Sequence, residues 1–131
     1  MIIGIGTDLV QISRIEEMLH TFGKTFEEKV FTLQEQAKAS SLPSNKRASF
    51  YAKRFAAKEA LSKALGSGIG MNAFFKEIEV KNDPKGAPYL VLYGHAHETL
   101  MQKSAGKTPH IHLSLSDEKS FANAFVVIEV L

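Results

Sequence analysis

Two carboxylates stand out because each is a lone acid in an otherwise apolar segment. Asp8 follows the apolar run IIGIG at residues 2–6, and Glu59 lies within RFAAKEALSKALG at residues 54–66. A buried ionised carboxylate is costly unless it is paired or bound to a metal. If the two acids meet in space they suit Mg²⁺, which takes one or two protein carboxylates and then water and substrate phosphate. The sequence therefore favours a magnesium site at Asp8 and Glu59.

Lys63 and the glycines that follow it extend this candidate site. On a helix Lys63 lies one turn beyond Glu59 on the same face, where its ammonium can neutralise a phosphate oxygen. The glycines of GSGIG, residues 66–70, permit close backbone approach to an anion. Simpler explanations are a Glu59–Lys63 ion pair, a turn aspartate at Asp8 and a helix C-cap at the glycines. The chain has no cysteine and its histidine spacing is poor, so zinc is the weaker choice.

The composition is that of an ordinary soluble globular protein. The chain has 131 residues, of which 44% are hydrophobic and 23% charged, and this length fits a single domain over residues 1–131. The N-terminus lacks the basic start of a signal peptide, and no window reaches the length of a transmembrane helix. We therefore expect a cytoplasmic protein with no membrane partner.

The basic residues are concentrated in one segment. Residues 1–37 carry three Lys or Arg against six acids, whereas residues 38–63 carry seven against Glu59 alone. The seven are Lys38, Lys46, Arg47, Lys53, Arg54, Lys58 and Lys63. Such a segment can attract a phosphorylated ligand, a nucleic acid or an acidic partner.

The hydrophobic pattern predicts an α+β fold with a mainly antiparallel sheet and one long helix packed on it. We expect a buried strand over 2–6 that ends at Thr7–Asp8, and further strands over 74–82, 88–94, 110–116 and 121–130. We expect helices from Ser13 to Gly23, over 33–40, from Arg47 to Leu65 and over 95–106. Capping boxes are expected at Ser13/Glu16 and at Thr32/Glu35. Phe121 and Phe125 are expected in the core.

Taken together, these segments resemble the holo-acyl-carrier-protein synthases, the small group within the phosphopantetheinyl transferases. The resemblance rests on GIGTDLVQISRI (4–15), RFAAKEALSKALGSGIG (54–70), EVKNDPKGAPYL (79–90), HIHLSLSDE (110–118) and ANAFVVIE (122–129). It implies Mg²⁺-dependent transfer of the phosphopantetheine arm of coenzyme A to a serine of apo acyl carrier protein. It also implies release of adenosine 3′,5′-bisphosphate and a role in fatty acid biosynthesis, part of lipid metabolism. The fold implied is a small α+β unit that assembles as a homotrimer with sites between neighbouring subunits.

The resemblance also implies roles for individual residues. Asp8 and Glu59 match the metal ligands of the family, and Lys63 matches its phosphate-binding lysine. Glu59, directly or through a water, is the candidate general base. The residues in segments that contact coenzyme A are Lys53, Arg54, Gly66, Gly86 and Pro88. Arg14 and Lys24 match the region that docks the acidic carrier protein.

Several positions leave alternatives open. Asp117 stands where many family members have histidine; we favour a turn residue over a polar contact or proton acceptor. The family often has an acid where Gln11 stands, and Glu16 and Glu17 make the basic face of the first helix thinner, which puts the strength of carrier binding in question. His112 and Ser116 share one polar strand face with His110, and are explained either by a half-exposed strand or by a place in the coenzyme pocket. A chelate of His110 and His112 is the weaker interpretation.

Two other functions compete with this one. A Mg²⁺-dependent phosphohydrolase would use Asp8 and Glu59 with water as the nucleophile and would need no protein partner. A nucleic-acid-binding domain would use the basic segment 38–63. That segment has few aromatic residues for stacking on bases, and this function would leave both acids unexplained. We therefore expect no nucleic-acid partner.

Overall fold

The chain folds as two antiparallel β units arranged around one long helix. The computed structural model describes residues 1–66, 68–70 and 74–131. The strands are β1 (Ile2–Gln11), β2 (Ile78–Asn82), β3 (Pro88–Leu92), β4 (Pro109–Asp117) and β5 (Phe121–Val130). The helices are α1 (Ile12–Phe22), α2 (Lys24–Val30), α3 (Leu33–Ser41), α4 (Ser44–Leu65) and α5 (Gly94–Ser104), with a 3₁₀ turn over Phe75–Glu77. The predicted α+β class is confirmed.

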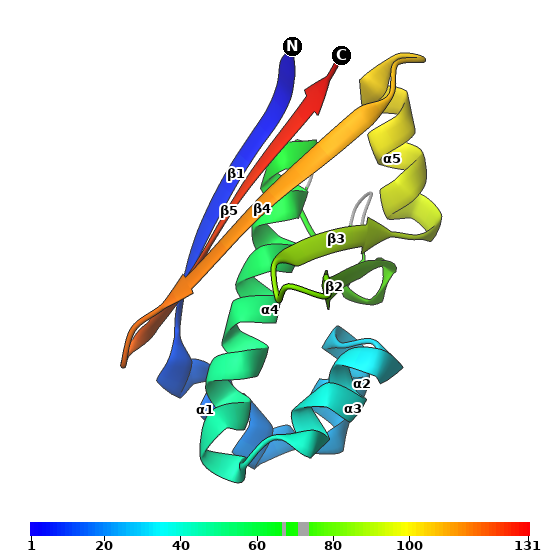
Figure 1. The fold of residues 1–131 in the computed structure, drawn as a ribbon. Coiled ribbons are helices and arrows are strands. Elements are labelled where there is room, and N and C mark those ends of the chain that lie inside the picture. The colour runs from blue at the N-terminus through cyan, green and yellow to red at the C-terminus, as the bar shows by residue number, and fades with distance from the viewer. Residues whose placement is uncertain (67, 71–73) are drawn as a thin grey trace.

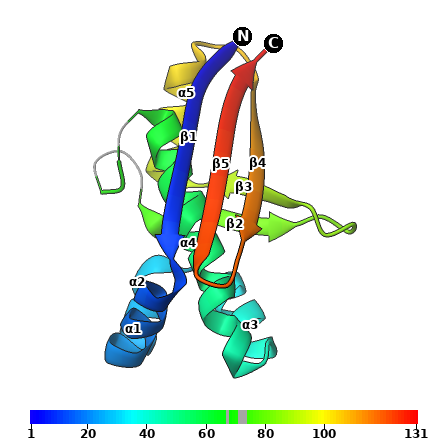
Figure 2. The same ribbon diagram turned by 90° about the vertical axis from the view of Figure 1, so that its left-hand side faces the viewer.

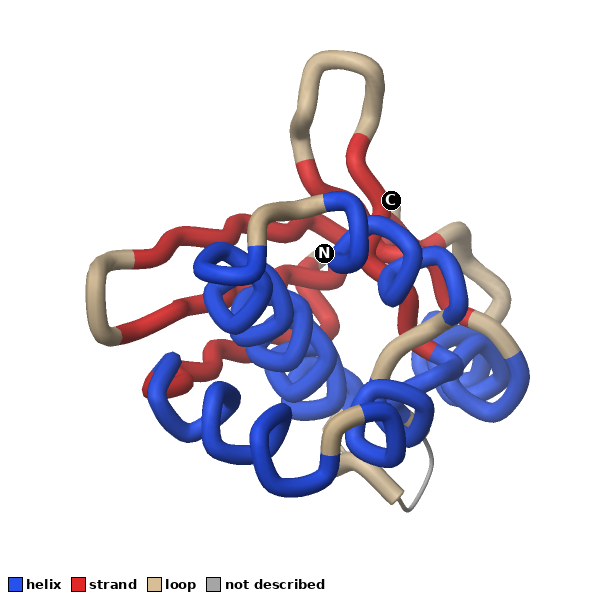
Figure 3. The backbone as a smooth tube through the Cα atoms, turned by 90° about the horizontal axis from the view of Figure 1, so that it is seen from below, coloured by secondary structure: helices blue, strands red, loops and turns tan. Residues whose placement is uncertain are grey.

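The strands form two sheets rather than one. The larger sheet has the order β1–β5–β4, and β2 and β3 form a separate hairpin; all pairs are antiparallel. Helix α4 lies against one face of the larger sheet, and the hairpin and α5 lie on the far side of α4 (Figure 1). The turn of the hairpin projects away from the rest of the chain (Figure 3). Within the described residues no helix is both long enough and apolar enough to cross a membrane.

Helix α4 is the centre of the core because it is covered on both sides. Its small residues let neighbouring backbones approach, and Ala52, Ala56 and Ala60 have no exposed surface. The helix begins at Ser44, three residues before the predicted Arg47, and ends at Gly66 in the left-handed conformation with φ 86°. The predicted C-cap is confirmed. Ser67, in the same GSGIG segment, lies outside the described residues.

The N-terminal helices differ from the prediction in two ways. Helix α1 begins at Ile12 with Gln11 as an N-cap that makes no side-chain bond, so the capping box at Ser13 was wrong. Strand β1 stays paired with β5 up to Gln11, and the helix begins at the next residue. Ser13 therefore lies inside the helix and cannot be its N-cap. Helix α2 was not predicted, because seven residues give too short a periodic signal. The capping box at Thr32 and Glu35 is confirmed.

The larger sheet leaves one face uncovered. Figure 2 looks onto this face, with α4 behind the strands. Ile5 and Leu9 are 60% and 64% exposed, and Phe121 and Phe125 are 44% and 40% exposed. The predictions of a buried strand at 2–6 and of core positions for the two phenylalanines were therefore wrong for a single chain. The reason is that α4 covers only the face that carries the alternate residues of each strand.

Candidate functional site

Strand β1 packs directly against α4, and two glycines make this contact possible. A β-carbon added at Gly4 would collide with the carbonyl oxygen of Ala64, and one added at Gly6 with that of Ala60. Any side chain at either position would push the strand away from the helix. The glycines thus hold the strand backbone on the helix backbone immediately before Asp8.

Asp8 lies in the middle of β1 and not at its end, as the sequence had suggested. It pairs with Ala124 of β5, and the pairing continues for three more residues. The turn-aspartate explanation is therefore wrong. Its side chain still reaches a site because β1 is an edge strand that runs along α4 (Figure 1).

Three of the predicted site residues meet where β1 and α4 touch. Lys63 Nζ donates to Asp8 Oδ1 at 3.2 Å and to the carbonyl oxygen of Thr7 at 2.9 Å. The side chain of Asp8 is 16% exposed and that of Lys63 is 54% exposed, so the ammonium stays accessible to a ligand. Lys63 pairs with Asp8, and no Glu59–Lys63 ion pair is present among the described residues. The simplest explanation of Glu59, a pair along its own helix, therefore does not hold.

Glu59 lies in an environment that opposes its negative charge. Burial raises the pKa of Glu59 above its ordinary value, and the nearby charge of Asp8 raises it further. The charges of Lys63 and Arg14 act in the opposite direction. Arg14, on α1, is therefore close enough to Glu59 to influence its charge, although its predicted role is in partner binding.

The donor set at this point fits a hard divalent cation. A cation beside Asp8 and Glu59 would offset both the desolvation and the repulsion that raise the pKa of Glu59. The described residues contain no group of three or more His, Asp or Glu side chains that could hold a metal. Mg²⁺ is compatible with only two protein carboxylates because it keeps several waters and binds substrate phosphate.

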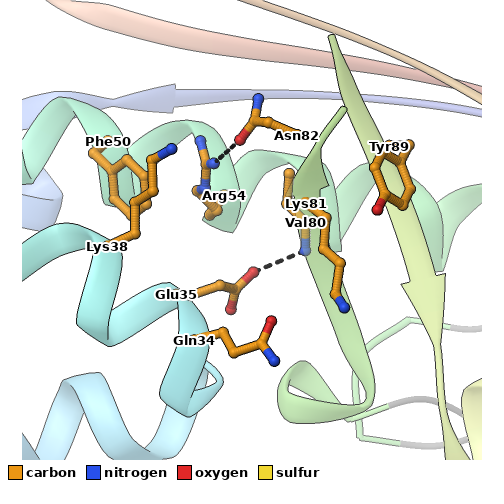
Figure 4. A pocket seen from close by; sticks show the side chains of 9 residues that line it. All are labelled: Gln34, Glu35, Lys38, Phe50, Arg54, Val80, Lys81, Asn82 and Tyr89. Atoms are coloured by element: carbon orange, nitrogen blue, oxygen red, sulfur yellow. Dashed lines mark hydrogen bonds between the residues drawn. The ribbon is translucent and has the colours of Figure 1, made fainter. Parts of the chain in front are cut away.

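A second group of predicted residues lies on another side of α4. Arg54 Nη2 donates to Asn82 Oδ1 at 2.8 Å, and Asn82 Nδ2 donates to the carbonyl oxygen of Gly86 at 3.0 Å. Pro88 begins β3 and pairs with Asn82. Arg54 also lines a pocket of about 240 Å³ between α3, α4 and the hairpin (Figure 4). Five residues separate Arg54 from Glu59, which turns the two side chains about 140° apart on the helix.

Lys53 forms a third group with Asp117 at the end of β4. Lys53 Nζ lies 3.4 Å from Asp117 Oδ1, and Ser49 Oγ donates to Asp117 Oδ2 at 3.0 Å. Asp117 therefore makes polar contacts that tie the β4–β5 turn to α4. Asp117 is the last paired residue of β4, so the favoured interpretation of a turn residue was wrong; its polar contacts are with Ser49 and Lys53 of α4.

The remaining predicted residues are not brought together with these groups. His112 and Ser116 lie on the exposed face of the sheet, where His112 Nε2 is 2.8 Å from Glu129 Oε1. Lys24 is exposed at the start of α2, and Gly66 follows one turn after Ser62 at the end of α4. Within one chain the predicted coenzyme residues therefore occupy separate places.

Sequence reasoning missed a buried ion pair next to Glu59. Lys58 and Glu35 are 0% and 2% exposed, and Lys58 Nζ donates to Glu35 Oε1 at 2.7 Å. The same ammonium donates to the carbonyl oxygens of Val30 and Phe75, both at 2.9 Å. The pattern of α4 placed Lys58 on a charged strip at the side of the helix. A lysine that follows two alanines in a helix that is apolar nearly all round was the signal that could have indicated burial.

Comparison with known proteins gives a consistent family. A family model described as the 4′-phosphopantetheinyl transferase superfamily (ACPS) matches residues 4–124. Holo-[acyl-carrier-protein] synthases of Sphingopyxis alaskensis and Caulobacter vibrioides are 52% and 50% identical over 132 residues, covering 100% of this chain and 98% of each relative.

Solved structures agree with the sequence relatives. The holo-(acyl-carrier-protein) synthase of Bacillus anthracis in complex with CoA (3′,5′-ADP) is similar with a TM-score of 0.83 and 40% identity, covering 100% of this chain and 99% of that one. The synthase of Neisseria meningitidis is similar with a TM-score of 0.85 and 38% identity, covering 98% and 99%.

Proposed function

The chain belongs to the 4′-phosphopantetheinyl transferase superfamily, in its holo-[acyl-carrier-protein] synthase group, and on this premise we propose a reaction. It moves the 4′-phosphopantetheine arm of coenzyme A to a serine of apo acyl carrier protein. The by-product is adenosine 3′,5′-bisphosphate, and the pathway served is fatty acid biosynthesis. The observation that carries the proposal is the meeting of Asp8, Glu59 and Lys63 at the β1–α4 contact.

The site residues have separate tasks in this reaction. The serine hydroxyl attacks the phosphorus that carries the pantetheine arm, and the bond from that phosphorus to the leaving bisphosphate breaks. Glu59, directly or through a water, is the candidate base that takes the hydroxyl proton. Lys63 binds a phosphate oxygen and offsets the charge that develops on the leaving group.

Asp8 and Glu59 are the proposed magnesium ligands. Mg²⁺, when bound, neutralises diphosphate charge and orients the reacting phosphorus. This assignment follows from the fit of two converging carboxylates to a cation that needs few protein ligands.

The carrier protein is proposed to dock beside the site. Arg14 and Lys24 lie on α1 and α2, both are exposed, and Arg14 is electrostatically coupled to Glu59. Basic side chains at this place would attract an acidic carrier and bring its serine near the site.

We also propose a homotrimer of single-domain chains in the cytoplasm. A core of buried residues contributed from strands and helices of both halves supports one domain. The uncovered apolar sheet face supports an assembly, because a patch of this kind is normally buried by a partner. Sites between subunits would also explain why the predicted coenzyme residues are separated within one chain.

Mass spectrometry of apo acyl carrier protein tests the reaction directly. The carrier is incubated with the enzyme, coenzyme A and Mg²⁺, and a parallel sample contains EDTA. We expect a mass gain of one phosphopantetheine arm that is absent with EDTA.

Variants at the two carboxylates test the site. Asp8→Ala and Glu59→Gln should fold normally and lose at least about 100-fold in transfer rate, because each removes a charge that acts in the transition state. Full activity in both would overturn the site assignment. Consumption of coenzyme A without any gain on the carrier would instead favour the phosphohydrolase.

A further inference from the structure

Lys58 is a buried charge that the proposed reaction does not use. It is 0% exposed and follows two alanines of α4, next to Glu59 in the sequence. Neighbouring residues of a helix point about 100° apart, so Lys58 faces a different side of α4 from Glu59. A side chain without exposed surface cannot touch a substrate. Any effect of Lys58 on transfer must therefore act through the groups that it contacts.

The ammonium of Lys58 connects α4 to three other segments. It donates to the carbonyl oxygens of Val30 and Phe75, both at 2.9 Å, and to Glu35 Oε1 at 2.7 Å. Val30 is the last residue of α2, Phe75 begins the turn that leads into β2, and Glu35 lies on α3. In the described part of the chain no other side chain of α4 bonds to three other segments.

Glu35 extends this connection to the β2–β3 hairpin. Its Oε2 accepts from the backbone N–H of Val80 at 2.9 Å, and its Oε1 also accepts from the N–H of Thr32 at 2.9 Å. Figure 4 shows Glu35 reaching from α3 toward the strand that carries Val80. The hydroxyl of Thr32 donates in turn to Glu79 Oε2 at 2.6 Å. Lys58 and Glu35, which we call the clamp, therefore connect α2, α3 and the hairpin to α4.

The clamp fixes geometry more than it adds stability. A buried ion pair recovers little of the cost of removing two charges from water, and apolar side chains of similar volume are often as stable. Charge-assisted hydrogen bonds, however, set the distance and direction between the groups that they join. In the clamp they join backbone groups of separate elements, so they determine where those elements lie on α4.

We propose that Lys58 is a positioning residue for the transfer reaction. The elements that it holds carry the proposed binding residues of both substrates, which are Lys24 on α2 for the carrier and Gly86 and Pro88 in the hairpin for coenzyme A. The clamp fixes both binding surfaces on the helix that carries Glu59. This inference rests on the proposed function, from which the two binding roles come.

Steady-state kinetics of a variant without the clamp charges test the proposal. Lys58→Met/Glu35→Gln removes both buried charges and leaves Asp8, Glu59 and Lys63 unchanged. We expect KM for the carrier and KM for coenzyme A each to rise about tenfold, with kcat within about twofold of wild type, because the binding surfaces shift while the reacting groups stay. Unchanged KM values, or a loss confined to kcat, would overturn the proposal.

A control variant separates positioning from a loss of stability. Val130→Ala removes buried side-chain volume at the end of β5, far from α2 and α3 (Figure 1). A smaller folded fraction lowers the apparent kcat and leaves KM unchanged, because the molecules that remain folded bind as before. We therefore expect both KM values of Val130→Ala to equal those of wild type. A rise in this control equal to that of the clamp variant would overturn the proposal.

A more conservative variant, Lys58→Gln/Glu35→Gln, gives a graded result. It has no buried charge, and its amide keeps a donor for one of the carbonyls of Val30 and Phe75. Its KM values should therefore lie between those of wild type and Lys58→Met/Glu35→Gln. If the methionine variant does not fold, the glutamine variant carries the test, and KM values equal to those of wild type would overturn the proposal.

Hydrogen exchange measures the clamp without any transfer reaction. The backbone amides of α2 and of the β2–β3 hairpin should exchange faster in the clamp variants than in Val130→Ala, because they lose their fixed connection to α4. Equal exchange in all variants would overturn the proposal. A wild-type protein that transfers nothing would instead count against the proposed function and leave the exchange result intact.

Discussion

Glu59 has a cost in stability, and its proposed use is in chemistry. Its carboxylate is partly buried and lies near a second acid, so its ionised form disfavours the folded, metal-free protein. Glutamine at the same position would keep the shape and remove the charge. Keeping an unfavourable charge at a functional site is the usual trade between stability and activity.

Because the ionised Glu59 disfavours the folded state, we expect Glu59→Gln to stabilise the metal-free protein at neutral pH. The pKa of Glu59 is raised in the folded state, so its contribution to stability is present below the pKa of the unfolded chain and is lost as pH rises through the folded pKa. The variant should therefore unfold a few degrees above wild type at pH 7, and this gain should shrink toward pH 4. Thermal unfolding in EDTA at both pH values measures it. A lower midpoint than wild type at pH 7 would contradict the account.

Among the secondary-structure elements, the contact between β1 and α4 decides where Asp8 lies. Gly6→Ala should force the strand off the helix, because the new methyl group would overlap the carbonyl oxygen of Ala60. We expect a loss of about 1–3 kcal/mol in the free energy of unfolding and a weaker response to Mg²⁺, since Asp8 moves with the strand. Gly68→Ala is the control, because nothing lies within 4 Å of its added β-carbon. Urea unfolding and magnesium titration of both variants give the result; equal behaviour would show that the glycines do not set the site.

The buried pair of Lys58 and Glu35 joins elements from both halves of the chain. Lys58→Met leaves Glu35 buried and unpaired, and should cost about 3–5 kcal/mol of unfolding free energy. Adding Glu35→Gln removes that charge and keeps one side-chain oxygen, which can accept from the N–H of Thr32 or of Val80 but not from both. The double variant should therefore be more stable than Lys58→Met alone in urea. If Glu35→Gln lowers the free energy of unfolding further, the unpaired charge of Glu35 is not the reason that Lys58→Met is destabilising.

What could be predicted at this scale followed from local signals. The long helix up to Leu65, the capping box at Thr32 and the alternation along β4 depend on neighbouring residues, and all three are confirmed. The length of β1 depends on its pairing with β5, which lies more than a hundred residues away. The burial of Lys58 depends on acceptors from three other segments. Such long-range partners leave no periodic pattern in the sequence.

The candidate site shows the same difference between local signals, which could be predicted, and long-range contacts, which could not. Asp8, Glu59 and Lys63 were found as lone charges in apolar segments, and the structure brings them together. The pairing of Lys63 with Asp8 instead of Glu59 could not be predicted, because it needs the strand to lie against the helix.

For the whole molecule, the proposed assembly would explain both the uncovered sheet face and the separation of the predicted coenzyme residues. The pair of Lys53 with Asp117 and the pocket that Arg54 lines both lie away from Glu59 within a single chain. A neighbouring subunit that packs on the exposed strands would both bury the apolar face and supply these residues to the site.

Phe125→Lys tests this arrangement, because it places a charge at an exposed position on β5 in the centre of that face. In a single chain the lysine would reach solvent and cost little, whereas in an assembly it would be buried without a partner. Wild type should sediment at about three times the chain mass of 14.4 kDa, and the variant should sediment as one chain with an unchanged circular dichroism spectrum and no transfer activity. Leu33→Lys is the matched control, since Leu33 is an apolar residue 78% exposed on α3, away from the sheet. A Phe125→Lys protein that still assembles, or a wild-type monomer that is fully active, would remove the shared site from the proposed mechanism.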